Sequence, residues 1–270
     1  MNATPLIIEP HHLEDMMGDA NLVIVDLCKA KQFAKAHIPN ALFVPYADIV
    51  HVEKPVMGLL PDNDSFSKLC SSLGIKSDTH VVAYDDEGGG CAARFVWTLY
   101  VFGHENASIL NGGLHSWANE GHALNNQPST AIPSDYWLTN SGMYTVTRDY
   151  ILQHYKQDNV ALLDARTIQE FTGEKKFAEK GGHIPGAIRY EWTDAIDKVD
   201  NLRMLSSDIL QKELDDLGLT KDKEIICYCQ SHHRSAYSWL MLRSLGYENV
   251  KGYPGSWSDW GNQANTPVEL

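Results

Sequence analysis

The chain has 270 residues, enough for two ordinary domains or one large one. Apolar residues make up 43% and charged residues 21%, a composition typical of a globular protein with a packed core, and no apolar run reaches membrane-spanning length. The net charge of −13 argues against a nucleic-acid partner, because phosphate binding needs a basic face.

The N-terminal segment predicts a cytoplasmic protein, and the cysteines are predicted to be free. Residues 1–5 lack the charged-then-apolar layout of a signal peptide. The cysteines are odd in number and scattered, at positions 28, 70, 91, 227 and 229. We therefore expect free thiols rather than a disulfide framework.

The first half of the chain alternates short apolar strands with amphipathic helices. Strands are predicted over residues 22–25, 41–44, 81–84 and 108–110, and helices over residues 29–36, 65–73 and 94–102. Continuous apolar strands with helices between them indicate a parallel sheet covered on both faces.

A segment with little periodicity, residues 125–144, separates the two halves. It contains a Pro-Ser-Thr stretch and a second proline, as expected for an extended connection. Its aromatic residues Tyr136 and Trp137 suggest that it packs on a domain surface.

The second half repeats the alternation. Strands are predicted over residues 160–163, 187–190, 224–228 and 250–251, and helices over residues 148–156, 207–217 and 235–245. In parallel sheets, binding sites form beyond the carboxyl ends of the strands. Cys229 lies at such an end.

Residue patterns recur at a spacing of 143 positions, which indicates a duplicated domain. The matching pairs are Gly103-His104-Glu105-Asn106 with Gly246-Tyr247-Glu248-Asn249, Gly112 with Gly255, and Trp117 with Trp260. Residues 37–41 likewise match residues 183–187, with eight extra residues before the second copy. We expect one domain over residues 1–124, a linker over 125–144 and a second domain over 145–270.

The stretch of residues 225–236 is the candidate active site. A buried strand runs into a short polar loop, with Cys229 at the strand end and Arg234 at the start of a helix. Loop N–H groups and a helix N-terminus then surround one sulfur atom and favour negative charge. We expect the Cys229 thiol to ionise below its ordinary pKa of about 8.5 and to act as a nucleophile.

With these motifs, the chain resembles a two-domain rhodanese, a sulfurtransferase, over nearly its whole length. The loop Cys229-Gln230-Ser231-His232-His233-Arg234 is similar to the cysteine-glutamine-threonine-histidine-histidine-arginine loop of one bacterial rhodanese group. The turn at Asp164-Ala165-Arg166, the His183–Ala187 segment and Gly255-Ser256-Trp257 also fit. The resemblance implies an α/β fold of two tandem rhodanese-like domains, each a parallel sheet with helices on both faces.

The resemblance also implies a reaction. The Cys229 thiolate would take sulfane sulfur from thiosulfate, become a persulfide, and pass the sulfur to cyanide or a thiol. Loop amides from Gln230 to Ser235 would stabilise the anionic sulfur. We expect a small anionic donor and a thiophilic acceptor as partners, no cofactor, no membrane or nucleic acid, and a monomer.

Two arginines are predicted to bind the donor. Arg234 is assigned to the sulfonate end, because a guanidinium can bind two oxygens at once. Arg166 resembles a family arginine near the donor, and a helix-surface salt bridge is its alternative role.

The remaining site residues are less distinctive. His232 and His233 could donate hydrogen bonds or carry charge, although a loop histidine is more often solvated. Trp192 could wall the pocket or be an ordinary packed aromatic. Cys227 is interpreted as core filling, with a resolving thiol as the alternative.

The first domain is expected to be inert. The spacing of 143 places Asp86 opposite Cys229. A carboxylate cannot carry sulfane sulfur, but it can occupy an amide-lined hollow as a permanent anion.

Other functions remain open. A 3-mercaptopyruvate sulfurtransferase would share the fold. A non-catalytic binding or sulfur-carrier module is a further alternative, which the presence of Cys229 weakens. A cysteine-dependent phosphatase uses five residues between cysteine and arginine, whereas this loop has four. The cysteine and histidine spacing of the loop does not match a structural zinc site, so we expect no metal.

Overall fold

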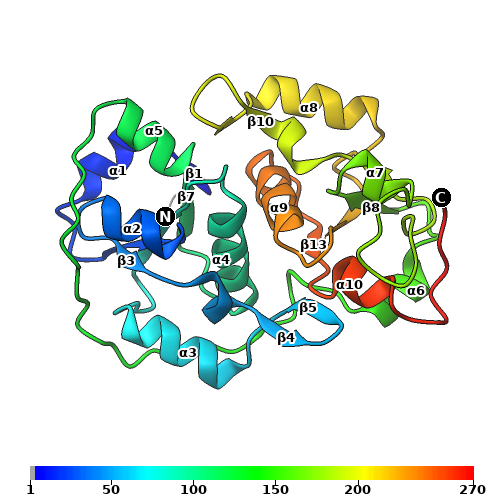
Figure 1. The fold of residues 1–270 in the computed structure, drawn as a ribbon, viewed down its shortest axis with the longest axis horizontal. Helices are drawn as coiled ribbons and strands as arrows, with labels where there is room; N and C mark the ends of the chain where they lie inside the picture. Colours follow the sequence, from blue (N-terminus) through cyan, green and yellow to red (C-terminus); the bar gives the residue numbers. More distant parts are fainter. Residues whose placement is uncertain (1–3) are drawn as a thin grey trace. The chain divides into compact units, whose positions relative to one another are not determined.

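The structure, a computed structural model, describes residues 4–270, which fall into two compact units (Figure 1). Unit 1 comprises the chain up to Ile49, Pro61–Ser141 and Ile196–Met204. Unit 2 comprises Val50–Leu60, Gly142–Ala195 and Leu205–Leu270. The sequence predicted two uninterrupted domains, whereas each unit of the structure includes a short hairpin from the other half of the sequence.

Unit 1 is built on a parallel sheet in the order β1-β7-β6-β2-β3. Its strands are β1 (Ile7–Ile8), β2 (Leu22–Asp26), β3 (Leu42–Phe43), β6 (His80–Tyr84) and β7 (Ala107–Leu110). The last four of these strands were expected from their apolar runs. β1 has only two residues and leaves no periodic signal.

The helices of unit 1 are α1 (Pro10–Met16), α2 (Ala30–Lys35), η1 (Tyr46–Ile49), α3 (Asn63–Ser72), α4 (Gly90–Val101) and α5 (Gly113–Asn119). α4 packs on β6 and β7 and is buried along its whole length. The unit also holds the hairpin of β10 (Ile196–Asp197) and β11 (Arg203–Met204), where Arg203 forms ion pairs with Glu9 and Glu120.

Unit 2 has a parallel sheet in the order β13-β12-β8-β9. Its strands are β8 (Val160–Asp164), β9 (Ile188–Arg189), β12 (Glu224–Tyr228) and β13 (Val250–Gly252). Every residue of the central strand β12 is buried. The sequence-based fold class, two α/β units with parallel sheets, is confirmed.

The helices of unit 2 are α6 (Arg148–His154), α7 (Ile168–Phe171), η2 (Trp192–Ala195), α8 (Ser207–Asp216), α9 (Arg234–Ser244) and α10 (Ser256–Trp260). Figure 1 shows α9, in orange, beside β13, and α9 packs against both β12 and β13. The loop between β12 and α9 therefore leaves the sheet at the carboxyl end of its central strand.

The segment between the halves lies along α3 in unit 1. The N–H groups of Tyr136 and Leu138 donate to the hydroxyls of Ser71 and Ser67 at 3.1 and 2.9 Å. Trp137 is 62% exposed, so only one of the two aromatics packs inward.

Candidate active site

Cys229 is the first residue after β12, and its side chain is almost fully buried. The carbonyl oxygens of Cys229 and Gln230 accept the N–H groups of Trp257 and Ser258 at 2.9 Å each. The first turn of α10 therefore holds the carbonyls at the start of the loop. His232, at φ 53°, lies in the left-handed region and turns the loop back toward α9.

The N–H groups of Ser231 and Ser235 and the Ser235 hydroxyl favour the ionised form of the Cys229 sulfur. Burial is the largest influence on the Cys229 thiol and acts to raise its pKa. The Arg234 charge, with these groups, outweighs burial, so the pKa is lower than that of an ordinary cysteine. These residues thus form a buried cradle that favours a thiolate.

A histidine lies behind the Ser235 hydroxyl. His232 is fully buried, and its Nδ1 lies 2.8 Å from Ser235 Oγ. The interpretation of His232 as a solvated loop residue is therefore wrong. When the Ser235 hydroxyl donates to the thiolate, the same oxygen accepts from the protonated Nδ1 of His232.

Arg234 forms an ion pair with Glu170. Its two terminal nitrogens donate to the two carboxylate oxygens of Glu170 on α7, at 2.7 and 2.8 Å. Burial acts to raise the pKa of Glu170, but Arg234 and Thr167 outweigh it and lower that pKa. This ion pair uses one N–H of each terminal nitrogen, and binding of a donor sulfonate by the other N–H groups of Arg234 stays a prediction. In this structure Arg234 acts on Cys229 through its charge.

The structure gives Arg166 a role that differs from both roles predicted for it. It is 1% exposed, and its guanidinium donates to Asp164 at the end of β8 and to the Gly182 carbonyl. Its charged carbon also lies 4.4 Å from the ring centre of Trp257. Neither donor binding nor a surface salt bridge describes it, because the buried Asp164 carboxylate needs a buried counter-charge.

The other predicted residues border the loop. Gln230 Nε2 donates to the Phe177 carbonyl at 3.2 Å. The Trp192 ring lies 5.9 Å from the His233 ring and 5.8 Å from the Tyr237 ring, between centroids. Trp192 therefore lies against the loop and the start of α9.

All five cysteines are free and buried, which confirms the expectation of free thiols. Burial is the largest influence on the other four thiols, Cys28, Cys70, Cys91 and Cys227, and raises the pKa of each. Cys229 is the one cysteine with a lowered pKa. Cys227 is fully buried within β12, in agreement with core filling.

The first unit has an aspartate at the position of Cys229, but this residue is Asp85. Tyr84 and Tyr228 mark the equivalence, because each ends its strand and accepts an isoleucine N–H through its hydroxyl. The assignment to Asp86 is therefore wrong by one residue. α4 has 12 residues and α9 has 11, so the spacing of 143 applies only beyond these helices.

Asp85 occupies the amide-lined hollow of unit 1. Its carboxyl oxygens accept the N–H groups of Glu87, Gly89 and Ala92 at 3.0, 2.8 and 3.0 Å. Burial raises the pKa of Asp85, and these three hydrogen bonds oppose the rise. Unit 1 thus carries a fixed side-chain acceptor where unit 2 has the Cys229 sulfur.

Replacing Asp85 with alanine is expected to lower the free energy of unfolding by about 3 kcal/mol, because three buried N–H groups lose their acceptor. Asp86→Ala is the matched control, since this half-buried neighbour is outside the hollow. A change within about 0.5 kcal/mol is expected for the control. Chemical denaturation measures both; equal effects of the two variants would contradict the assignment.

The lowered pKa of Cys229 predicts the pH dependence of the thiolate. As pH falls below about 8.5, an ordinary cysteine becomes protonated, whereas Cys229 stays ionised until its own lower pKa is reached. The ultraviolet absorbance of the thiolate, taken as the difference from Cys229→Ser, measures this titration. Ser235→Ala should move the midpoint to higher pH, because a hydrogen bond to the thiolate is lost.

Ser238→Ala is the control for that titration. Ser238 lies one turn further along α9, and its buried hydroxyl has no hydrogen-bond partner among the described residues. Its loss should leave the midpoint unchanged. A midpoint in the parent protein at or above about 8.5 would contradict the proposed stabilisation of the thiolate.

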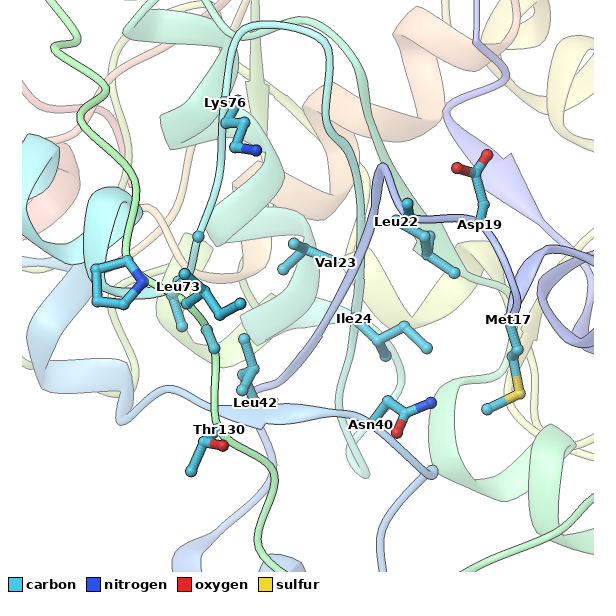
Figure 2. A pocket seen from close by; sticks show the side chains of 15 residues that line it. Met17, Asp19, Leu22, Val23, Ile24, Asn40, Leu42, Leu73, Lys76 and Thr130 are labelled. Carbon is cyan, nitrogen blue, oxygen red and sulfur yellow. The ribbon is translucent and has the colours of Figure 1, made fainter.

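A cavity of about 450 Å³ lies in unit 1 (Figure 2). Its walls come from β2, the end of α3 and the segment 130–133, with Asp19 and Lys76 as its charged residues. Neither cysteine nor histidine lines it. The cavity therefore offers no nucleophile comparable to Cys229.

Sequence reasoning missed Glu170 as a site residue. Thr167 and Glu170 form a capping box at the start of α7, and this motif is visible in the sequence as threonine and glutamate three positions apart. The spacing predicts a helix start, but it does not reveal that Glu170 also binds Arg234. That contact depends on the packing of α7 against the loop.

Comparisons with known proteins agree with these observations. A family model described as a rhodanese-like domain matches residues 9–120 and 147–263. Thiosulfate sulfurtransferases from Pseudomonas aeruginosa and Azotobacter vinelandii are 42% and 43% identical to this chain, over 98% of it and 97% of each relative. A Thermus thermophilus protein named sulfur carrier protein TtuD is 35% identical, over 95% of this chain and 92% of its own length.

Among solved structures, the 3-mercaptopyruvate sulfotransferase SseA from Escherichia coli superposes with a TM-score of 0.84 at 26% identity, covering 94% of this chain and 99% of SseA. An anaerobic ergothioneine biosynthesis enzyme from Chlorobium limicola gives 0.87 at 18% identity, covering 98% and 70%. The second likeness concerns the fold alone. Within residues 4–270, no helix is both long and apolar enough to cross a membrane.

Proposed function

The chain belongs to the rhodanese-like family, and on that premise we propose that it is a thiosulfate sulfurtransferase whose sulfur-carrying residue is Cys229. The observation that carries the proposal is the lowered pKa of one buried thiol among five. The two relatives named thiosulfate sulfurtransferase cover almost the whole chain and support thiosulfate as the donor.

The reaction proceeds through two displacements. The Cys229 thiolate attacks the outer sulfur of thiosulfate, a new sulfur–sulfur bond forms, and sulfite leaves with the electron pair of the broken bond. The product is a persulfide anion on Cys229. A thiophilic acceptor such as cyanide or a thiolate then attacks the terminal sulfur, and the Cys229 thiolate is regenerated.

The cradle around Cys229 suits both states of this cycle. The thiolate and the persulfide each carry one negative charge, and the N–H groups of Ser231 and Ser235 are fixed by the loop before either forms. Arg234 supplies a positive charge that Glu170 holds in place. Because the cradle exists before reaction, little reorganisation is needed when the sulfur is transferred.

Two other activities within the family stay open to test. The fold of the Escherichia coli 3-mercaptopyruvate enzyme favours mercaptopyruvate as an alternative donor, and the Thermus thermophilus relative favours a carrier role. A phosphatase is less favoured, because four residues separate Cys229 from Arg234. The cytoplasmic location, the monomeric state and the absence of a metal or cofactor stay predictions.

The donor is identified by initial rates with the purified protein. Sulfite release from thiosulfate with cyanide as acceptor is compared with pyruvate release from 3-mercaptopyruvate and with hydrolysis of an aryl phosphate. We expect kcat/KM to be largest for thiosulfate and undetectable for the phosphate ester. A larger kcat/KM for mercaptopyruvate would overturn the donor, and stoichiometric loading without turnover would favour the carrier role.

A further inference from the structure

A short hairpin from the first half of the sequence belongs to unit 2. β4 (His51–Glu53) pairs antiparallel with β5 (Val56–Leu59), and the segment Val50–Leu60 clusters with unit 2. β5 lies against α10, as Figure 1 shows, and the Met57 N–H donates to Ser258 Oγ at 3.0 Å. The hairpin thus packs on the helix that holds the carbonyls of the active-site loop.

Gly58 allows the hairpin to approach the backbone of the active-site loop closely. A β-carbon at residue 58 would lie 2.0 Å from the carbonyl oxygen of Ser231, 2.5 Å from its carbonyl carbon and 2.8 Å from the carbonyl oxygen of Pro254. These are backbone atoms, so a side-chain rotation cannot relieve the overlap. Gly58 has an ordinary φ, and glycine is required here by space rather than by backbone conformation.

The contact falls on the loop residue that faces the sulfur. The Ser231 N–H favours the ionised form of the Cys229 sulfur, and the Ser231 carbonyl lies against Gly58. The N–H and the carbonyl of Ser231 belong to consecutive peptide planes that meet at one α-carbon, so a displacement of the carbonyl that moves this α-carbon also moves the N–H. Because hydrogen bonds weaken steeply with poor angles, a small rotation would weaken the donor to sulfur.

We propose that Gly58 is a positioning residue for sulfur transfer: the β4–β5 hairpin presses on the Ser231 carbonyl and fixes the direction of the Ser231 N–H toward Cys229. The inference rests on the proposed role of Cys229. Gly58, which comes from the first half of the sequence, would then contribute to the chemistry of Cys229 in the second half.

The test uses the full-length protein with Gly58→Ala and a matched control, Gly18→Ala. A β-carbon at residue 18 meets no atom within 4 Å. Gly58→Ala should raise the midpoint of the Cys229 thiolate titration and lower kcat between about 10-fold and 100-fold, because one donor to the anion is misdirected. Gly18→Ala should match the parent protein in both measurements.

If Gly58→Ala does not fold, a second variant, Ser258→Ala, tests whether the hairpin positions the loop. Ser258→Ala removes the acceptor of the Met57 N–H and loosens the hairpin without adding atoms. It should shift the titration midpoint in the same direction by a smaller amount. A folded Gly58→Ala with an unchanged midpoint and kcat, or a Ser258→Ala that leaves both unchanged where Gly58→Ala is unfolded, would overturn the proposal.

The titration separates this inference from the proposed function. If the parent protein does not turn over thiosulfate, the donor assignment fails, yet the midpoints of the parent, Gly58→Ala and Gly18→Ala still report whether the hairpin positions the loop. If the parent is active and the midpoints of all three agree, the hairpin inference fails alone.

Discussion

Replacement of Cys229 by alanine is expected to reduce sulfur transfer from thiosulfate at least about 10,000-fold, to the level of the uncatalysed reaction. The reason is that the persulfide has no other site: burial raises the pKa of the other four thiols. Steady-state rates with thiosulfate and cyanide measure the loss.

Cys227→Ala is the matched control for this variant. Cys227 lies two residues earlier in the same chain segment, is fully buried, and does not form part of the cradle. We expect kcat within about twofold of the parent, with a modest loss of stability from the small cavity. A Cys229→Ala protein that keeps a substantial fraction of the parent rate would contradict the assignment of the nucleophile.

The second large effect is expected at the Arg234–Glu170 ion pair. Arg234→Gln removes the positive charge that lowers the pKa of Cys229 and leaves the Glu170 carboxylate buried without its partner. We expect kcat/KM at neutral pH to fall by about 100-fold or more. The free energy of unfolding should fall by about 3 to 5 kcal/mol, because an uncompensated buried charge is costly.

A double variant separates the catalytic effect from the structural one. Arg234→Gln combined with Glu170→Gln replaces the ion pair with two neutral amides, so most of the lost stability should return. Activity should not return, because the positive charge near Cys229 is still missing. Recovery of both together would mean that Arg234 acts only by holding the loop.

Arg189→Gln is the control for the removal of an arginine from unit 2. Arg189 is partly exposed and interacts with Glu191 and Asp194 at 3.5 and 3.6 Å. An exposed pair of this kind contributes about 1 kcal/mol or less. The control should keep its activity and most of its stability.

The sequence allowed most strands of both sheets and their parallel arrangement to be predicted, because these strands are continuous apolar runs between helices. The order of the strands in each sheet was not predicted. The sequence predicted the start of α4 at residue 94, whereas the helix begins at Gly90. The prediction was late because three successive glycines are typical of a loop. Gly88 and Gly89 do adopt positive φ, and the helix starts directly after them. Short elements such as α5 and α10 have too few residues for a periodic signal.

Only the part of the candidate site that lies in one contiguous segment could be predicted from the sequence. Cys229 and the loop amides follow from one contiguous motif. Glu170, Gly58 and the burial of His232 depend on contacts between distant segments, and no spacing in a single sequence reveals them. Arg166 was misassigned for the same reason, because the burial of Asp164 decides its partner.

The most direct measurement is the mass of each cysteine peptide after the protein is incubated with thiosulfate and then digested without reductant. The account predicts one added sulfur atom on the peptide containing Cys229, which disappears when cyanide is supplied. Sulfur distributed over the peptides of Cys28, Cys70 and Cys91, or absent from Cys229 while sulfite is released, would contradict it.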